Sequence, residues 1–389
     1  MSPAAGRSGP QAPALPAPVV LAAGGTGGHV FPAQALAAEL RRRGRPVAVV
    51  TDSRGAAFDA EAATHRVRAA SPSRSLPGMT AAACDLGIGT VQAWTLLRRL
   101  KPAAVVGFGG YPSVPPLLAA SWLRLPTLLH EQNAVLGRAN RLLAPRVDRI
   151  ATSFAEIEAV RPEDRRKLAC TGNPVRPAIA ALAGAPYRSP DPEGTLDLLV
   201  LGGSQGARVF SEVIPEAVAA LPERQRARLR IAQQCRPEDL EAARARYAAI
   251  GVAAELSAFF PDVPERLAAA QLVIARAGAS TVVELTAVGR PAILVPYPHA
   301  MDDHQTANAR AVDAAGGAWL MPQGAFSPAA LAARLEAFLT LPATLGKAAA
   351  AAARLGRPDA AARLADLVES ALRAAAPASG RSETRSLAA

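Results

Sequence analysis

Two glycine-rich turns, residues 24–29 and 202–206, lie in different halves of this 389-residue chain. Each turn follows a short apolar run and precedes an amphipathic segment with helical spacing. A turn of this kind between a strand and a helix lets backbone N–H groups and the helix N-terminus approach a phosphate closely. The pair therefore predicts two Rossmann-like domains that face each other across a cleft holding a phosphorylated ligand.

Apolar strand-like runs alternate with helical patterns in both halves of the chain. In the first half we expect strands at residues 19–23, 47–51, 104–107 and 127–130, and helices at 31–43, 89–100 and 113–123. In the second half we expect strands at 196–201, 229–233, 252–256, 272–275 and 292–295, and helices at 237–249, 262–269 and 280–288. This order is typical of an α/β fold with doubly wound parallel sheets.

Proline and other turn residues between positions 174 and 192 interrupt the alternation, which indicates an interdomain linker. The predicted divisions are a disordered N-terminal extension (1–17), an N-terminal domain that binds acceptor and membrane (18–177), a linker (178–194), a C-terminal donor-binding domain (195–345), C-terminal helices (346–376) and a disordered tail (377–389). We expect the C-terminal helices to pack back on the N-terminal domain.

The chain carries 43 Lys and Arg against 32 Asp and Glu, a net charge of +11. A surplus of this size indicates a polyanionic partner, such as nucleic acid, anionic lipid or a phosphate-bearing substrate. Aromatic residues make up only 4% and do not interleave with a basic run, which argues against nucleic acid. No apolar run reaches the roughly 18 residues that cross a bilayer, and three widely spaced cysteines fit a reducing cytoplasm.

The glycine turns fit a dinucleotide site poorly. That site needs the pattern G-x-G-x-x-G and an acidic residue at the end of the next strand, about 20 residues further on. After the first turn, Asp52 comes later than this spacing, and after the second turn the next strand ends in Gln233 and Gln234. We therefore disfavour a dinucleotide as the ligand.

Four further clusters of glycine and polar residues fall where expected strands end and helices begin. They occupy residues 107–113, 130–133, 171–176 and 276–284. Open parallel sheets bind their ligands at this rim. The clusters therefore predict one shared site between the two domains.

With these motifs, the chain resembles the MurG-type UDP-N-acetylglucosamine transferases of peptidoglycan synthesis, a family with the two-domain GT-B fold. The resemblance covers about residues 18–375. It rests on Gly-Gly-Thr-Gly-Gly-His-Val-Phe-Pro-Ala, His-Glu-Gln-Asn, Gly-Asn-Pro-Val-Arg and Gly-Gly-Ser-Gln-Gly-Ala-Arg, in this order. Any one of these turns is weak support, whereas the ordered set is specific.

The resemblance implies an inverting glycosyltransferase that moves GlcNAc from UDP-GlcNAc to the C4 hydroxyl of undecaprenyl-diphospho-MurNAc-pentapeptide (lipid I), which gives lipid II. It also implies a peripheral enzyme at the cytoplasmic face of the bacterial plasma membrane, with other cell-wall synthesis proteins as candidate partners. The chain has no Asp-x-Asp motif to chelate Mg²⁺ at a diphosphate, so we expect neither a metal nor another cofactor.

The resemblance further implies a donor site with contributions from both domains. Its expected members are Thr26, Gly27, Gly28, Asn133, Arg176, Ser204, Phe259, Phe260, Ala279, Ser280, Thr281, Glu284 and Gln305. Arg176 and the turn around Ser204 would face the diphosphate, because a cation and a helix N-terminus both stabilise its charge. Glu284 would accept hydrogen bonds from the ribose hydroxyls.

Three of these assignments keep a structural alternative. Phe259 and Phe260 match the stretch that holds the uracil ring, but Phe260 fits core packing nearly as well. Ser280 could contact phosphate or sugar, or could simply cap the helix that follows it. Gln305 matches a contact to the GlcNAc hydroxyls, and Glu284 could instead be a solvated helix acid.

His29 is the candidate general base, because an imidazole can remove the proton of the acceptor hydroxyl as the new bond forms. The alternative is a structural histidine that caps the helix beginning near Val30. Glu131 is the second candidate base. The residues expected near the acceptor are Gly24, Gly25 and Tyr111.

An apolar stripe followed by cations predicts contact with an anionic membrane surface. Its members are Ile88, Val91, Trp94, Leu97, Arg98 and Arg99. Trp122 and Arg124 resemble a neighbouring part of the same patch. The alternative is an ordinary helix face packed in the core, which has the same spacing.

Three other functions compete with this hypothesis. A UDP-GlcNAc 2-epimerase would share the fold and the donor but would need no lipid. A membrane-associated scaffold for wall synthesis would not need Arg176, Glu284 and Gln305. A glycolipid synthase of related fold would differ only in its acceptor.

Overall fold

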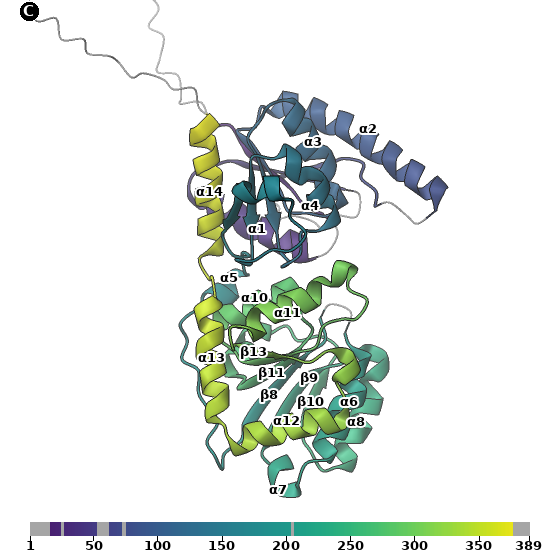
Figure 1. Ribbon diagram of the computed structural model, residues 1–389, viewed down its shortest axis with the longest axis vertical. Helices are drawn as coiled ribbons and strands as arrows, with labels where there is room; N and C mark the ends of the chain where they lie inside the picture. Colours follow the sequence, from purple (N-terminus) through teal and green to yellow (C-terminus); the bar gives the residue numbers. More distant parts are fainter. Residues whose placement is uncertain (1–15, 25–26, 53–61, 72–74, 204–205, 376–389) are drawn as a thin grey trace, which may run out of the picture.

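The computed structural model describes residues 16–24, 27–52, 62–71, 75–203 and 206–375, which form two α/β domains stacked along the long axis of the molecule (Figure 1). Each domain is built on one parallel sheet, with seven strands in the first and six in the second. The predicted fold class is therefore confirmed. Apolar runs between turn-forming residues give buried strands, and amphipathic helices cover them.

The N-terminal sheet has the strand order β3-β2-β1-β4-β5-β6-β7. Its strands are β1 (Val19–Ala22), β2 (Val47–Thr51), β3 (Ala63–Arg66), β4 (Ala104–Gly107), β5 (Thr127–Glu131), β6 (Arg149–Thr152) and β7 (Leu168–Cys170). The α-helices of this half are α1 (Gly27–Arg42), α2 (Leu76–Leu100), α3 (Val114–Trp122) and α4 (Arg138–Leu143). The strand order reverses between β1 and β4, where open α/β sheets bind ligands.

The C-terminal sheet has the order β10-β9-β8-β11-β12-β13. Its strands are β8 (Leu196–Leu201), β9 (Leu229–Gln234), β10 (Ala254–Ser257), β11 (Leu272–Ala275), β12 (Ala292–Leu294) and β13 (Ala318–Leu320). Its α-helices are α6 (Arg208–Ala219), α7 (Glu223–Arg226), α8 (Leu240–Ala249), α9 (Val263–Ala269), α10 (Ala279–Val288), α11 (His304–Asp313), α12 (Pro328–Thr340) and α13 (Ala343–Leu355). Short 3-10 helices are η1 (Tyr111–Ser113), η2 (Ala144–Arg146), η3 (Pro162–Lys167), η4 (Pro237–Asp239), η5 (Met301–Asp303) and η6 (Gln323–Ala325).

Side-chain alternation along the strands divides the N-terminal core into two layers. On β5, Leu129 packs in the layer that contains Leu97 of α2, whereas Leu128 packs in the layer that contains Leu36 of α1. Successive strand residues point to opposite faces of a sheet. The residues that follow Leu128 at intervals of two therefore face α1, which begins at the first glycine turn.

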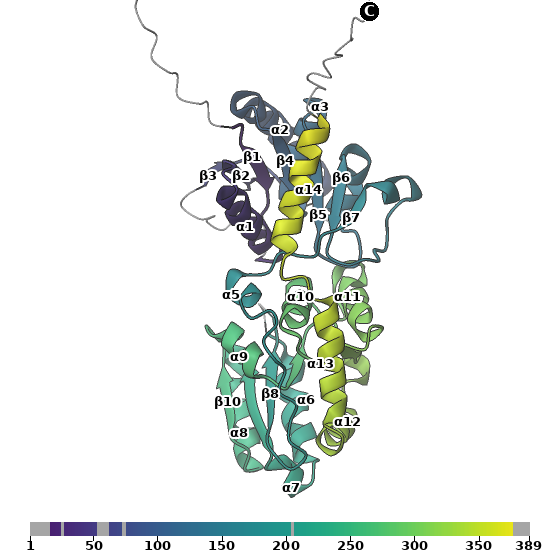
Figure 2. The ribbon, with the colours of Figure 1, turned by 90° about the vertical axis from the view of Figure 1, so that its left-hand side faces the viewer.

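The chain passes between the domains twice. Helix α5 (Pro177–Ala180) lies on the first passage, and α14 (Ala360–Ala375) lies on the N-terminal domain after the second (Figure 2). Leu364 and Val368 of α14 pack in the layer of α1, and Arg43 forms an ion pair with Asp366. Of the expected C-terminal helices, α13 remains on the C-terminal domain against α10, so only α14 crosses back.

The two passages touch at Gly172. This residue has a φ of 82°, and a Cβ on it would lie 2.7 Å from the Cβ of Arg357. Both the left-handed backbone and the close approach require glycine here. The end of β7 is thus fixed against the chain that leads into α14.

Helix α2 is much longer than predicted, because it begins at Leu76 rather than near residue 89. Glycines at positions 78, 87 and 89 obscure its helical pattern in the sequence. Gly89 has a packing reason, since a Cβ there would lie 1.8 Å from the carbonyl oxygen of Arg68. Strand β3, Ala-Thr-His-Arg, has no apolar alternation and was not predicted because it is a mostly exposed edge strand.

Candidate active site

The carboxyl ends of the two sheets meet at the domain boundary. Asn308 of α11 is fully buried there, and its Oδ1 accepts a hydrogen bond of 2.7 Å from the N–H of Ala134, just after β5. Its Nδ2 donates to Asn133 Oδ1 at 3.1 Å and to the carbonyl of Ala277, just after β11, at 3.0 Å. One amide therefore joins strand ends that were predicted to form a shared site.

His29 lies in the first turn of α1 and is half-buried. Its Nδ1 is 3.0 Å from Oε1 of Gln132. The Nε2 of Gln132 lies 2.9 Å from the carbonyl of Phe108 and 3.0 Å from Nδ1 of His130. The Nε2 of His130 lies 3.1 Å from the carbonyl of Gly172. A continuous polar chain thus runs from His29 to the passage between the domains.

His130 is fully buried, and burial lowers its pKa to about 4. The hydrogen bond to the Gly172 carbonyl opposes this shift, because a carbonyl stabilises a protonated imidazole, while the nearby His29 adds to it. His130 is therefore neutral at pH 7. A neutral imidazole has one donor and one acceptor nitrogen.

The carboxylate of Glu131 is 2% exposed and is engaged on both oxygens. Its Oε1 accepts from the N–H and the side chain of Asn133, and its Oε2 accepts from the N–H of Gly137 at 2.8 Å and from Asn140 Nδ2 at 2.7 Å. These bonds tie down the loop after β5. Glu131 thus holds the loop that carries Asn133 rather than presenting a free oxygen.

Arg176 and Glu284 contact each other. The Arg176 Nε donates to Glu284 Oε1 at 2.8 Å, and its NH2 group donates to Oε2 at 2.9 Å. Arg176 precedes α5 and Glu284 lies on α10, so the pair joins the first interdomain passage to the C-terminal domain. The two residues expected to bind diphosphate and ribose therefore lie side by side.

Neighbouring atoms approach both glycine turns so closely that a side chain would not fit. A Cβ at Gly202 would lie 2.6 Å from the backbone nitrogen of Ala207, and a Cβ at Gly24 would lie 2.9 Å from Pro112. Gly27 and Gly28 form the start of α1. Of the other residues expected in these turns, Gly25, Thr26 and Ser204 lie outside the described residues.

Of the two phenylalanines after β10, Phe259 lies at the surface and Phe260 lies in the core. Phe259 is 71% exposed and available to a ligand. Phe260 is 4% exposed, and the guanidinium of Arg266 lies 4.1 Å from its ring centroid. The side chain of Phe260 therefore packs in the core, as its structural alternative expected, and a contact of its backbone with the uracil edge stays a prediction.

Helix α10 begins with the expected residues Ala279, Ser280 and Thr281, but its N-cap is Gly278. Ser280 therefore is not the cap that the structural alternative required. A helix N-terminus has backbone N–H groups without intrahelical acceptors and a positive dipole end. This end of α10 directly follows Ala277, whose carbonyl binds Asn308 at the domain boundary.

Gln305 lies in the first turn of α11, and its Oε1 accepts from the N–H of Tyr297 at 2.9 Å. Arg276, half-buried after β11, donates to the carbonyls of Val295 and Pro296 in the same loop. Burial lowers the pKa of Arg276 below its ordinary value. These contacts fix the loop on which Gln305 rests.

Asp302, just before α11, adds a charged contact between the domains. Its carboxylate accepts from Arg138 at 2.9 Å and from Arg141, both on α4. The bond from Arg138 holds the pKa of Asp302 below its usual value. Helix α11 is therefore attached to the N-terminal domain by Asp302 at its start and by Asn308 one turn further on.

Gly109 and Gly110, which have φ values of 84° and 68°, bring the loop after β4 against the ring of His29. A Cβ at Gly110 would lie 3.6 Å from Nε2 of His29. Tyr111 follows at once, partly buried against the N-terminal core. The expected acceptor residue Tyr111 therefore directly follows the glycine that lies against the candidate base.

The predicted membrane stripe on α2 is only partly exposed. Ile88 and Val91 are 44% and 62% exposed, and Trp94 is partly buried with the Arg98 guanidinium 4.7 Å from its ring centroid. Leu97 is 1% exposed in the core, so its assignment to the membrane patch is wrong. Arg99 is exposed.

Trp122, on α3 beside α2, is 63% exposed. Within the described part of the chain, no helix has the length and apolarity needed to cross a membrane, although α2 has 25 residues. The exposed apolar residues Ile88, Val91 and Trp122 lie on the surface of the N-terminal domain.

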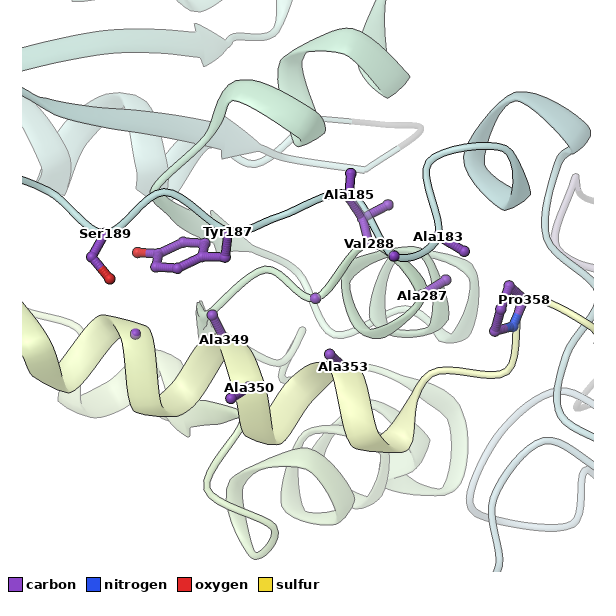
Figure 3. Close-up of a pocket in the computed structure, with 13 residues that line it drawn as sticks. Ala183, Ala185, Tyr187, Ser189, Ala287, Val288, Ala349, Ala350, Ala353 and Pro358 are labelled. Atoms are coloured by element: carbon purple, nitrogen blue, oxygen red, sulfur yellow. The ribbon is translucent and has the colours of Figure 1, made fainter.

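A separate pocket of about 500 Å³ lies between the linker and α13 (Figure 3). Most of its lining is alanine and glycine, and the larger Tyr187 donates its hydroxyl hydrogen to the carbonyl of Gln271. It shares no lining residue with the expected donor, acceptor or catalytic residues. The pocket therefore does not belong to the candidate active site.

Sequence reasoning gave no role to three polar residues that the structure places in the site: His130 and Gln132, which it had only grouped in the cluster at 130–133, and Asn308. The first two belong to the quoted His-Glu-Gln-Asn motif, and strand alternation from Leu128 puts them on the face toward α1. Asn308 follows Gln305 by three residues, which places both on one helix face. These spacings could have identified all three.

The fold and the site define a two-domain glycosyltransferase of the GT-B class. Residues 19–152 match the glycosyltransferase family 28 N-terminal domain, and residues 197–364 match the C-terminal domain of the same family. The chain belongs to glycosyltransferase family 28.

Its relatives are similar over nearly their whole length. A UDP-N-acetylglucosamine--N-acetylmuramyl-(pentapeptide) pyrophosphoryl-undecaprenol N-acetylglucosamine transferase from Rhodospirillum centenum is 62% identical, over 94% of this chain and 97% of the relative. A protein of the same name from Paramagnetospirillum magneticum is 58% identical, over 90% and 95%. The crystal structure of Acinetobacter baumannii MurG has a TM-score of 0.75 at 31% identity and covers 91% of this chain and 100% of that one.

The similarity to UDP-GlcNAc 2-epimerases is of a different kind. The structure of a putative epimerase from Listeria monocytogenes has a TM-score of 0.64 but only 16% identity. At that identity the likeness shows the shared fold alone. It gives the epimerase hypothesis no support beyond the fold.

Proposed function

We propose that this chain transfers GlcNAc from UDP-GlcNAc to the C4 hydroxyl of lipid I, with inversion at the anomeric carbon, to give lipid II. The activity for which relatives up to 62% identical are named supports the reaction class and both substrates. The single structural observation that carries the proposal is the position of His29. Its half-buried ring is joined through Gln132 and His130 to Gly172 at the passage between the domains, and Gly110 lies beside its Nε2.

The reaction needs a base and a stabilised leaving group. The C4 oxygen of the acceptor attacks the anomeric carbon while its proton passes to His29 Nε2, and the bond from the anomeric carbon to the β-phosphate oxygen breaks. The departing UDP gains negative charge. Donors already aimed at that charge lower the barrier without reorganising.

We assign the donor diphosphate to the turn at Gly202, the N-terminus of α10 and the cation of Arg176. Backbone N–H groups and a fixed guanidinium stabilise phosphate charge. Glu284, next to Arg176, would accept the ribose hydroxyls, and Phe259 would cover the uracil. Gln305 and Asn133, which approach from opposite domains, would contact the GlcNAc hydroxyls.

We assign the base to His29 rather than Glu131. The Glu131 carboxylate accepts four hydrogen bonds, three from the loop after β5 and one from Asn140 of α4, so taking a proton would break part of that network. His29 uses only Nδ1 in the polar chain described above. Its Nε2 remains for the acceptor.

We also propose peripheral attachment to an anionic membrane surface through α2 and α3, on the cytoplasmic side, where lipid I would be presented. Exposed Ile88, Val91 and Trp122 supply apolar area, and Arg98 and Arg99 supply positive charge. Apolar burial and attraction to anionic headgroups act together in such attachment.

The test is transfer of labelled GlcNAc from UDP-GlcNAc to a short-chain lipid I analogue, with and without EDTA and with an acceptor-free control. The expected result is acceptor-dependent, EDTA-resistant formation of the disaccharide product. Acceptor-independent conversion of UDP-GlcNAc to its 2-epimer would replace this function by the epimerase. Donor binding without any turnover would replace it by the scaffold.

A further inference from the structure

We propose that Gln132 and His130 are positioning residues that fix the tautomer of His29, with hydrogen on Nδ1 and the lone pair on Nε2. The catalytic meaning of this relay rests on the proposed function, because the acceptor hydroxyl is what Nε2 would meet. The tautomer itself is a property of the protein without substrate. Two backbone carbonyls, those of Gly172 and Phe108, determine which atom donates in each hydrogen bond between His130, Gln132 and His29.

The first end is the carbonyl of Gly172. A carbonyl oxygen can only accept, so His130 must donate its Nε2 hydrogen across the 3.1 Å contact. Burial keeps His130 neutral, so its Nδ1 has no hydrogen and must accept. The partner 3.0 Å from that Nδ1 is the amide nitrogen of Gln132.

The second end is the carbonyl of Phe108, which fixes the orientation of the Gln132 amide. The amide nitrogen donates one hydrogen to this carbonyl at 2.9 Å and the other to His130 Nδ1. The carbonyl of His130 also lies 3.2 Å from this nitrogen, so turning the amide over would place its oxygen against three acceptors and leave its nitrogen without them. Both neighbours therefore require the same orientation, with Oε1 toward His29.

The consequence for His29 follows from the chemistry of the amide oxygen. Oε1 of Gln132 can only accept, so the Nδ1 of His29, 3.0 Å away, must donate. A neutral imidazole with hydrogen on Nδ1 has its lone pair on Nε2. The hydrogen bond on one ring nitrogen thus sets the role of the other, as it does for many functional histidines.

The surroundings make this arrangement rigid. Gln132 is 2% exposed and His130 is fully buried, so water does not compete for their hydrogen bonds. The ring of His130 also packs 5.6 Å from the ring of Phe108. Gly172 is held by the chain that leads into α14, so the far end of the relay is anchored where the domains connect.

The direct experiment records long-range ¹H–¹⁵N correlations of the whole protein with ¹⁵N-labelled histidine at pH 8, without substrates. The chain has five histidines, and His→Gln variants assign them one by one. The expected result is hydrogen on Nδ1 for His29 and on Nε2 for His130. A His29 ring that carries its hydrogen on Nε2, or an equal mixture of both forms, would overturn the proposal whether or not transfer is observed.

Two variants separate positioning from packing. Gln132→Met keeps the length of the side chain but has no amide. In this variant the form of His29 with hydrogen on Nε2 should become the majority. Turnover should fall about 10- to 100-fold, while the KM for UDP-GlcNAc stays within twofold of wild type. Gln132→Glu keeps the shape of the side chain but has no hydrogen to donate to the carbonyl of Phe108 and to Nδ1 of His130, so it should not restore the wild-type turnover. Unchanged tautomer and turnover in Gln132→Met would contradict the relay.

Gln233→Met is the matched control. Gln233 is an equally buried glutamine at the end of β9, bonded to Tyr247 and Cys235 in the other domain. Its replacement should lower stability without changing the tautomer of His29. A tautomer change as large as that of Gln132→Met would mean that the spectrum reports general destabilisation, and the relay would be rejected.

Discussion

The guanidinium of Arg176 and the carboxylate of Glu284 form a two-bond ion pair, with N–O distances of 2.8 and 2.9 Å. Glu284 is the more buried partner, with 14% of its side chain exposed against 37% for Arg176. A bidentate pair of this kind fixes both planes. Each residue therefore orients the other for the donor contact assigned to it.

This relationship predicts coupled effects on donor binding. Glu284→Ala should weaken UDP-GlcNAc binding by about 1.5–3 kcal/mol, the scale of a hydrogen bond to a charged group. Arg176→Ala should do the same, and the double variant should lose less than the sum, because either single change already disrupts the pair. Calorimetric titration measures all three. Arg230→Ala, which removes a surface pair with Asp197, is the control; additive losses would contradict the coupling.

The hydrogen bonds of Asn308 predict that this residue helps to hold the two domains together. Asn308→Ala removes two hydrogen bonds that join the domains and a third to the carbonyl of Ala277, and leaves the Ala134 N–H without its acceptor, a cost of about 2–4 kcal/mol to the contact between the domains. With saturating UDP-GlcNAc, small-angle scattering should give a larger radius of gyration for this variant than for the wild type. Thr306→Ala, which removes a hydrogen bond to Asp303 before the same helix, should scatter as wild type. Identical profiles for all three proteins would disprove the role of Asn308.

The lowered pKa of His130 predicts that the folded protein loses stability in acid. Its folded pKa of about 4 lies below the ordinary value of about 6.5, so between these values the unfolded chain binds a proton that the folded protein does not. Its contribution is fully present above pH 6.5 and decreases by up to about 1.4 kcal/mol per pH unit as the pH falls toward 4. The melting temperature of the wild type should therefore drop more between pH 7 and pH 5 than that of His130→Gln. Equal drops would rule out His130, and His299→Gln controls for removing an exposed histidine.

The surface of α2 predicts membrane binding. Replacing Ile88 and Val91 together by Glu adds charge where apolar area should enter the lipid, and should reduce binding to vesicles with anionic phospholipid at least tenfold. Co-sedimentation measures this binding. Leu341→Glu, which changes a 65% exposed leucine on the C-terminal domain, is the control. Wild-type binding by the double variant would exclude this face.

Much of the fold could be predicted from the sequence, because it depends on local patterns. The strands at 47–51, 104–107 and 272–275 have the predicted bounds, since each is a short apolar run between turn residues. The exposed strand β3 could not be found in this way. Its place depends on pairing with β2, which supplies backbone hydrogen bonds that no side-chain pattern reveals.

The sequence was enough to name several residues of the site, but not the contacts that these residues make with one another. The motifs identified His29, Arg176 and Glu284, because their chemistry suits a phosphorylated donor and a hydroxyl acceptor. The pairing of Arg176 with Glu284 depends on how the linker crosses to α10, which is a tertiary relationship. Leu97 shows the same limit, since helical spacing alone does not tell which part of a stripe the core covers.

The central claim is that His29 takes the proton of the acceptor hydroxyl. The most direct measurement is the single-turnover rate of GlcNAc transfer to a lipid I analogue by His29→Gln, with both substrates saturating and donor affinity measured separately. We expect a rate about 10²- to 10⁴-fold below wild type, the usual contribution of a general base, with donor affinity within twofold. A wild-type rate would contradict it, and equal losses of rate and donor affinity would make His29 a structural residue.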